Sequence, residues 1–142
     1  MSGWLLDTNV LSELRKPRCA PAVRTWVDAR DARELFVSSV TFAEIRFGIG
    51  LLQDAGRRHE LNLWLETELR PWFGERVIEI DEPVILRWRE LVESGRKVGR
   101  TYSQPDLFLA AAASVHGLCM ATHNTADFRG TGVALVDPWS EQ

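Results

Sequence analysis

Four acidic residues stand at positions where an α/β sheet places its chemistry. Asp7 directly follows the apolar run Trp4-Leu5-Leu6, whose lack of polar alternation is typical of a strand buried on both faces of a parallel sheet. Ligand sites in open α/β sheets lie just beyond the carboxyl ends of the strands. The other three acids occupy comparable positions: Glu44 in the helix after the second expected strand, Asp106 at the opening of a nearly all-apolar helix, and Asp127 after the fourth expected strand.

Each acid also has a simpler explanation in local structure. Asp7 is a suitable cap for the helix that follows it, and Thr41-Phe42-Ala43-Glu44 fits a capping box. Asp106 can offset a helix dipole, and Asp127 can form a turn. The apolar surroundings of Glu44 and Asp106 nevertheless predict that neither is fully solvated. Acids near a core are rarely buried unless they are paired or bind a cation.

A converging set of four carboxylates needs a cation to offset its mutual repulsion. Hard oxygen ligands select Mg²⁺ or Mn²⁺. Such ions activate water and stabilise the charge that develops during in-line displacement at phosphorus. Nearby hydroxyl and amide side chains can orient that water or the carboxylates, namely Thr8, Asn9, Thr122 and Asn124. The pattern points to metal-dependent hydrolysis of phosphodiesters, with the four acids as catalytic and metal-binding candidates.

Apolar patterning predicts strands that alternate with helices. The expected strands cover residues 4–6, 35–37, 77–80, 118–121 and 133–136. The expected helices cover a short segment ending at 14, a segment from 21, residues 40–53, a segment carrying 61–69 and ending near 71, a segment from 81 through 92, and residues 103–115. A polar connector is expected over 94–103. This alternation indicates one α/β domain with a parallel sheet, spanning residues 1–142.

The expected helix over 40–53 is apolar on two sides. Glu44 shares one stripe with Phe47 and Leu51, and a second stripe includes Ile45 and Ile49. A helix of this kind is usually packed on two sides. The second stripe is either a dimer face or additional core.

Composition excludes several function classes. The 142 residues carry a formal net charge of −3, so no bulk basic field indicates nucleic-acid binding, although a local basic patch stays possible. Two cysteines are too few for a disulfide framework. The opening apolar stretch is too short for a secretory signal, and no apolar run approaches the length of a membrane span. A reduced, cytoplasmic protein with no membrane contact is expected.

Four motifs resemble those of a known family and occur in its order. The stretch from Leu5 to Glu13 (LLDTNVLSE) resembles the opening motif of PIN-domain nucleases, especially VapC-type toxins of bacterial toxin–antitoxin pairs. Residues 43–48 (AEIRFG) resemble the second motif of that family, residues 105–111 (PDLFLAA) the third and residues 122–128 (THNTADF) the fourth. The ending, from Gly130 through Asp137-Pro138-Trp139, is similar to the FitB-like branch. The resemblance covers about residues 4 to 139.

The resemblance implies a three-layer α/β/α sandwich around a parallel sheet of about five strands. It implies a Mg²⁺- or Mn²⁺-dependent endoribonuclease that forms a homodimer, possibly within a higher toxin–antitoxin assembly, and is inhibited by a small VapB-like antitoxin. The acidic metal site would then consist of Asp7, Glu44, Asp106 and Asp127. Thr122 and Asn124 would support it, as would Thr8 and Asn9. His123 occupies a position that is often basic in the family.

Three other interpretations remain open. A phosphatase with Asp7 as its nucleophile usually carries a second Asp two residues later, where this chain has Asn9. A catalytically weak PIN-fold binding or regulatory module would be expected to lack one of the four acids, and none is missing. A DNA-directed nuclease is also compatible, because such a site cuts phosphodiesters without itself choosing the sugar.

Two weaker signals concern the substrate. Arg96, Lys97 and Arg100 either contact RNA phosphates or form a solvated basic loop. His123 either touches the substrate or is an incidental neighbour of the site.

Overall fold

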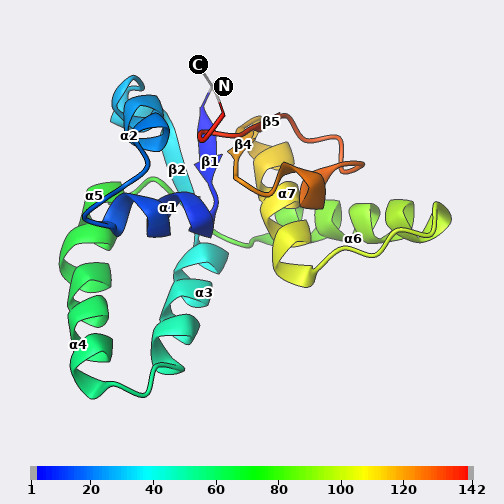
Figure 1. The fold of residues 1–142 in the computed structure, drawn as a ribbon. Helices are drawn as coiled ribbons and strands as arrows, with labels where there is room; N and C mark the ends of the chain where they lie inside the picture. Colours follow the sequence, from blue (N-terminus) through cyan, green and yellow to red (C-terminus); the bar gives the residue numbers. More distant parts are fainter. Residues whose placement is uncertain (1–2, 141–142) are drawn as a thin grey trace.

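The computed structural model describes residues 3–140, and its centre is a five-stranded sheet in which all pairings are parallel. The strand order is β3-β2-β1-β4-β5, so β1 is the middle strand (Figure 1). The strands are β1 (Trp4–Leu6), β2 (Leu35–Ser38), β3 (Val77–Ile78), β4 (Cys119–Ala121) and β5 (Leu135–Val136). The five expected strands are therefore confirmed, with the third and fifth shorter than expected.

Helices cover both faces of this sheet. They are α1 (Thr8–Arg15), α2 (Pro21–Asp28), α3 (Ser39–Gly50), α4 (Ala55–Trp64), α5 (Arg70–Phe73), α6 (Glu82–Lys97) and α7 (Gln104–His116). Three shorter turns complete the chain: the 3₁₀ turns η1 (Ala32–Glu34) and η3 (Thr125–Phe128), and the π-helical turn η2 (Leu65–Leu69). The three-layer α/β/α sandwich is thus confirmed.

Two adjacent residues of β1 show why there are three layers. Leu5 and Leu6 are both fully buried, and they point to opposite faces because side chains alternate along a strand. Leu5 packs into a cluster with residues of α6 and α7, such as Leu91 and Leu107. Leu6 packs into a second cluster with residues of α1 and α2, such as Val10 and Val23. The apolar run Trp4-Leu5-Leu6, which has no polar residue between its apolar ones, therefore forms the middle strand and lies between two cores.

The helices α3 and α4 form an arm that extends away from the sheet (Figure 1). The side chain of Arg46 on α3 forms an ion pair with Glu66 on η2, which ties the two sides of the arm together. On the other side of the molecule, α6 packs along α7 and reaches outward (Figure 1). Within residues 3–140, no helix has the length and apolar character needed to cross a membrane.

The structure corrects the expected orientation of α3. The stripe with Ile45 and Ile49 is buried in the core, at 8% and 5% exposure. The stripe with Glu44 is exposed, and its neighbours Phe47 and Leu51 are each 68% exposed. Two apolar stripes of similar composition compete for the core, and periodicity alone does not choose between them. The expectation that Glu44 is shielded from solvent is therefore wrong.

The structure also moves two helix boundaries. The cap of α3 is Ser38, whose hydroxyl accepts a hydrogen bond from the Val40 N–H, so the capping box expected at Thr41–Glu44 does not form. Helix α6 continues to Lys97, into the expected polar connector. The glycine within that extension, Gly95, is buried: a Cβ there would lie 2.8 Å from the carbonyl oxygen of Arg100. Close packing of the returning chain, rather than a helix end, explains this glycine.

Candidate active site

Asp7 lies where the central strand becomes a helix. Its backbone N–H donates to the carbonyl of Ala121 at 3.0 Å, which continues the pairing of β1 with β4. Its Oδ1 accepts from the N–H of Thr8 at 2.8 Å, so Asp7 is the N-cap of α1. The carboxylate is only 8% exposed. Asp7 thus caps a helix and also presents a nearly buried charge at the carboxyl edge of the sheet, so its capping role does not exclude a functional one.

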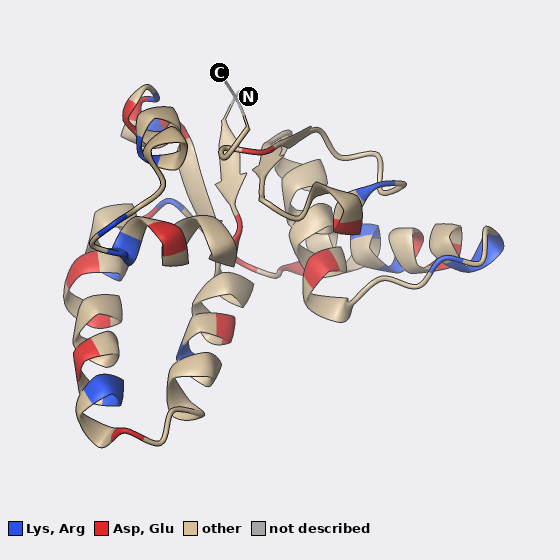
Figure 2. Cartoon of the chain, viewed as in Figure 1, with Lys and Arg blue, Asp and Glu red and all other residues tan. Residues whose placement is uncertain are grey.

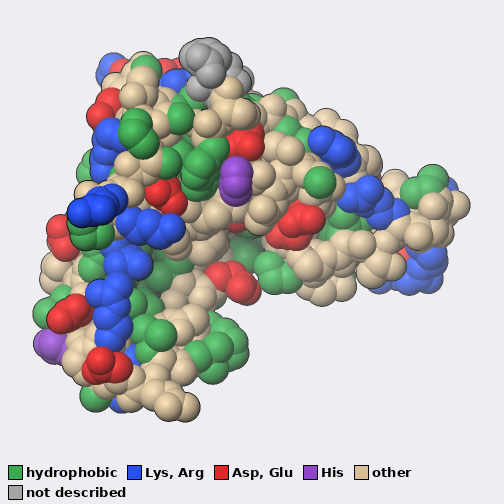
Figure 3. All heavy atoms as spheres, viewed as in Figure 1, with side chains coloured by type: hydrophobic (Ala, Val, Ile, Leu, Met, Phe, Trp, Pro, Cys, Tyr) green, Lys and Arg blue, Asp and Glu red, His purple; other side chains and the backbone are tan. Residues whose placement is uncertain are grey.

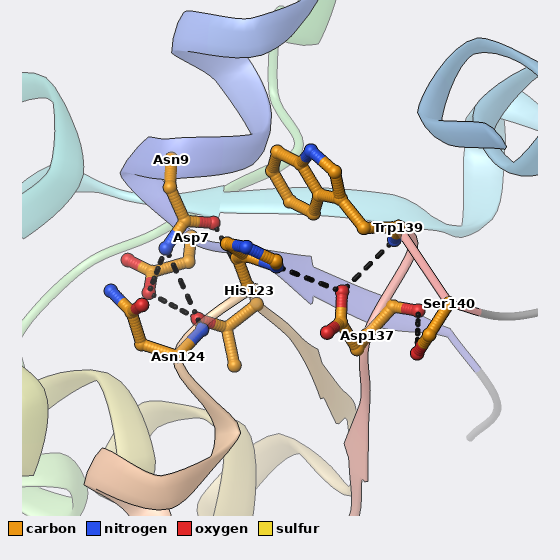
Figure 4. A network of polar contacts seen from close by, with 8 residues as sticks. Asp7, Asn9, His123, Asn124, Asp137, Trp139 and Ser140 are labelled. Atoms are coloured by element: carbon orange, nitrogen blue, oxygen red, sulfur yellow. Dashed lines mark hydrogen bonds and ion pairs between the residues drawn. The ribbon is translucent and has the colours of Figure 1, made fainter. Parts of the chain in front are cut away.

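The second carboxylate oxygen of Asp7 is fixed by side chains from both ends of the chain. The hydroxyl of Thr122, which follows β4, donates to Oδ2 at 2.8 Å, and the Asn9 amide donates to it at 3.4 Å (Figure 4). Thr122 Oγ1 accepts from the Asn9 amide at 3.2 Å and from the Asn124 N–H at 3.0 Å. One donor and two acceptors exhaust the capacity of a hydroxyl. The Thr122 hydroxyl therefore has one orientation, and it holds Asp7 in place.

Electrostatic coupling joins Asp7 to two of the other predicted acids. Burial raises the pKa of Asp7, hydrogen bonds from Thr122 and Thr8 oppose that rise, and the charges of Asp106 and Asp127 add to it. Burial also raises the pKa of Asp106, the Ser103 hydroxyl opposes it, and Asp127 again adds to it. Acidic positions at the end of β1, the first turn of α7 and η3 lie on the same side of the molecule (Figure 2). These three acids form one mutually repelling group.

Glu44 stands apart from that group. It lies on the exposed face of α3, and its charge is not among those that raise the pKa of Asp7 or Asp106. It does line a cavity of about 270 Å³ together with Thr8 and Ser12 of α1, next to Asp7. Figure 3 shows acidic side chains around the hollow between the α3–α4 arm and the side formed by α6 and α7. Glu44 therefore lines a cavity between α1 and the α3–α4 arm, beside Thr8, without joining the group.

The donor set of this site suits a divalent cation. Among residues 3–140, no three His, Cys, Asp or Glu side chains are close enough together to enclose a metal ion as they stand. The three coupled acids offer only hard oxygen donors, and their mutual repulsion raises pKa values that a cation would lower. Hard oxygen donors with uncompensated negative charge are the ligands of Mg²⁺ and Mn²⁺. The residues present thus fit the cation that their types predicted.

The basic residues predicted to touch substrate have unequal surroundings. Arg96, in the last turn of α6, lies 3.8 Å from a carboxylate oxygen of Glu93. Lys97 is exposed at the end of the same helix. Arg100 is engaged by the fold: its guanidinium donates to the carbonyl of Ala126 in η3 at 2.8 Å and lies 4.8 Å from the ring centre of Tyr102.

Two residues near the site had no signal in the spacing of the sequence. Asp137 and Trp139, which follow β5, contact the ring of His123, which follows β4 (Figure 4). The backbone N–H of His123 donates to Asn9 Oδ1 at 3.2 Å. His123 is therefore joined through Asn9 to Asp7, and only the pairing of β4 with β5 brings Asp137 to it.

Comparison with known proteins identifies the family of the chain. The PIN domain family model matches residues 4–133, a range that contains all four predicted acids. The chain is 33% identical over 137 residues to Toxin FitB of Neisseria gonorrhoeae, which covers 96% of this chain and 99% of FitB. It is 34% identical over 135 residues to VapC ribonuclease Y4jK of Sinorhizobium fredii, which covers 95% of this chain and 96% of Y4jK.

Solved structures show the same architecture. FitAcB from Neisseria gonorrhoeae aligns with a TM-score of 0.91 at 33% identity, covering 97% of this chain and 99% of that one. VapBC-1 from nontypeable Haemophilus influenzae aligns with a TM-score of 0.75 at 26% identity, covering 99% of this chain and 100% of that one. The family model covers most of the chain, and relatives above 30% identity match it over nearly their full length, so the chain belongs to the PIN-domain family.

Proposed function

We propose that this protein is a metal-dependent endoribonuclease and the toxin of a toxin–antitoxin pair. The observation that carries the proposal is the position of Asp7, which is nearly buried at the carboxyl edge of the sheet and is held there by Thr8, Asn9 and Thr122. Burial, and to a smaller extent the charges of Asp106 and Asp127, raise its pKa, and carboxylates of this kind gather at functional sites. The named activities of relatives support the choice of substrate, since Y4jK is called a VapC ribonuclease and FitB a toxin.

In this proposal, Asp7, Asp106 and Asp127 hold Mg²⁺ or Mn²⁺, and Glu44 contributes from α3 across the hollow. When bound, the cation supplies a nucleophilic water at neutral pH and stabilises negative charge on the phosphodiester. Thr122 and Asn9 hold Oδ2 of Asp7, and the Thr8 N–H holds Oδ1, so the carboxylate does not rotate when the substrate enters. Asn124 fixes the Thr122 hydroxyl through its backbone N–H.

The RNA strand lies in the hollow between the α3–α4 arm and the α6–α7 side. Arg96 and Lys97, at the end of α6, contact its phosphates. Arg100 contributes less to substrate binding, because its guanidinium is engaged with Ala126 and Tyr102. A phosphate contact by a basic side chain contributes affinity independent of sequence, and salt weakens that contribution.

The comparisons also support a proposal about partners. FitB is named a toxin, and VapBC-1 bears the name of VapBC, which is described as a family of toxin–antitoxin systems. We infer that a VapB-like antitoxin binds this chain and that the toxin forms a homodimer. The protein would act in the cytoplasm as a single PIN domain spanning residues 1–142.

Cleavage of a panel of structured RNAs by the purified, antitoxin-free protein tests the activity. Cutting should require Mg²⁺ or Mn²⁺ and should disappear in Asp7→Asn, which keeps the size of the side chain and removes its charge. Glu75→Gln is a matched control, since Glu75 is exposed and precedes β3, away from the carboxyl edge of the sheet. If the folded wild-type protein cuts no RNA in the presence of either metal, the ribonuclease proposal is wrong, and single-stranded DNA is the next substrate to test.

A further inference from the structure

His123 combines exposure with an unusually fixed position. Its side chain is 53% exposed, yet its backbone and its ring are both held. The backbone N–H donates to Asn9 Oδ1, the ring Nδ1 lies 3.3 Å from Oδ1 of Asp137, and the ring centre lies 4.3 Å from that of Trp139. Fixing an exposed side chain in one conformation costs conformational entropy. An exposed ring that is nevertheless held in one orientation is suited to bind a ligand from solvent.

The partners that hold the ring are themselves ordered. Oδ1 of Asp137 also accepts from the backbone N–H of Trp139 at 2.9 Å, and the Asp137 side chain is only 22% exposed. Figure 4 shows the His123 ring between the group around Asp7 and Asp137, beside the Trp139 indole. The direction of the imidazole is therefore set by Asp137 and Trp139, and its place beside the site is set by Asn9.

This arrangement leaves one nitrogen for a ligand. An ionised carboxylate can only accept hydrogen bonds, so Nδ1 carries the proton that faces Asp137. In the described part of the chain, residues 3–140, no protein group forms a hydrogen bond with Nε2. Two carboxylates act on the ring: Oδ1 of Asp137 lies 3.3 Å from Nδ1, and Glu13 interacts with His123 electrostatically. Both would stabilise a positive charge on the ring when an anion binds at Nε2.

The chemistry of the neighbouring site selects the anion. The cation proposed for Asp7, Asp106 and Asp127 would offset charge at the scissile phosphate, which leaves the neighbouring phosphate in need of a donor from the protein. His123 can provide that contact when it is protonated, because both ring nitrogens of an imidazolium are donors. We propose that His123 Nε2–H binds a phosphate of the RNA strand next to the scissile one, with Asp137 and Trp139 as positioning residues. This inference rests on the proposed ribonuclease function.

RNA binding without cleavage measures this contact directly. The parent protein carries Asp106→Asn to block cutting, and the probe is a short fluorescein-labelled RNA of mixed sequence followed by fluorescence anisotropy. We expect His123→Gln to weaken binding about tenfold. The slope of log K against log salt should become shallower by about 0.7, the change for one lost phosphate contact on a single strand. His59→Gln is the matched control, because His59 is exposed on α4, and it should bind like the parent.

The positioning role has its own variants. Asp137→Asn keeps an oxygen that accepts from Nδ1–H and should retain most of the affinity, whereas Asp137→Ala should weaken binding nearly as much as His123→Gln. In a background that retains Asp106, His123→Gln should raise KM for RNA cleavage and leave kcat within about twofold.

Two results would overturn the inference, and they can be told apart. If the parent binds RNA and His123→Gln binds equally well with the same salt slope, His123 is not a phosphate contact and the ribonuclease proposal stands. If the parent binds no RNA and the wild-type protein cuts none, both proposals fail together.

Discussion

The hydroxyl of Thr122 donates to Oδ2 of Asp7 at 2.8 Å, although the two residues are 115 positions apart in the chain. This bond lowers the pKa of Asp7 against the effect of burial. Thr122→Val keeps the shape and removes the bond, so the pKa of Asp7 should rise further. The acid limb of the pH profile of kcat/KM should then move to higher pH, because a larger fraction of Asp7 is protonated at a given pH.

The same substitution should also lower stability. Thr122 is fully buried, and its loss removes a charge-assisted bond and the acceptor for Asn9 and Asn124. We expect a loss of about 1–3 kcal/mol in the free energy of unfolding, measured by urea denaturation. Thr122→Ser keeps the hydroxyl and should restore the pH profile. An unchanged profile in Thr122→Val would show that this bond does not control Asp7.

Asp7→Asn should be more stable than the wild-type protein at neutral pH in the absence of divalent cations. The folded state raises the pKa of Asp7 above its ordinary value, so it binds the proton more tightly than the unfolded chain does. Stability that depends on this group is therefore present at low pH and is lost as pH rises through the raised pKa. The variant escapes that loss, and the difference in melting temperature should vanish in acid. A less stable variant at pH 7 would contradict this reasoning.

Divalent cations should reverse that order. A cation held by Asp7, Asp106 and Asp127 binds the folded state and raises its melting temperature, by roughly 3 °C for each kcal/mol of linked binding energy. Mg²⁺ and Mn²⁺ should stabilise the wild-type protein and leave Asp7→Asn nearly unaffected in a thermal melt. Equal shifts in the two proteins would place the binding elsewhere. This readout is independent of any RNA.

Tyr102 and Gly130 should show strong energetic coupling. The Tyr102 hydroxyl donates to the carbonyl of Arg129 at 2.8 Å, and a Cβ at Gly130 would lie 2.6 Å from that hydroxyl oxygen. Gly130 also has a φ of +89°, where side chains are disfavoured. Gly130→Ala should cost about 2 kcal/mol or more through strain and collision. Tyr102→Phe removes the hydroxyl and should relieve part of that cost in the double variant, which a double-mutant cycle measures.

Alanine substitutions at Arg100 and Lys97 should have different effects, because Arg100 holds η3 in place whereas Lys97 is proposed to bind substrate. Arg100→Ala removes the bond to Ala126, next to Asp127, so it should lower kcat and the melting temperature. Lys97→Ala should raise KM and weaken the salt dependence of RNA binding without a change in stability. If Arg100→Ala instead changed only KM and the salt dependence of RNA binding, the hydrogen bond of Arg100 with η3 would not be needed for stability or for kcat.

The strand ends could be predicted because their signals are local. The apolar run before Asp7 and the proline and hydroxyl residues before Asp106 mark the ends of elements in any tertiary setting. Once the elements alternate, a parallel sheet brings the carboxyl ends of its strands to one edge, where Asp7 follows β1 and Asp127 follows β4. Asp106 is coupled to them because α7 leads into β4 and so begins at that same edge.

The features that could not be predicted depend on long-range packing. Both stripes of α3 carry large apolar side chains, and the core that includes Val10 and Leu11 of α1 buries Ile45 and leaves Glu44 exposed. Gly95 does not end its helix, because the backbone of Arg100 returns against it. The contact of His123 with Asp137 depends on β4 lying beside β5, and no periodicity encodes that pairing.

The central position of β1 has a consequence for synthesis on the ribosome. Asp7 directly follows β1, whereas its hydroxyl partner Thr122 follows β4 and is made 115 residues later (Figure 1). Until β4 emerges, β1 has an open edge, and Asp7 lacks both its hydroxyl partner and its neighbours Asp106 and Asp127. A nascent chain therefore lacks an assembled site until β4 and η3 have been made. Under the proposed function, RNA cleavage can begin only after both of these elements have left the ribosome.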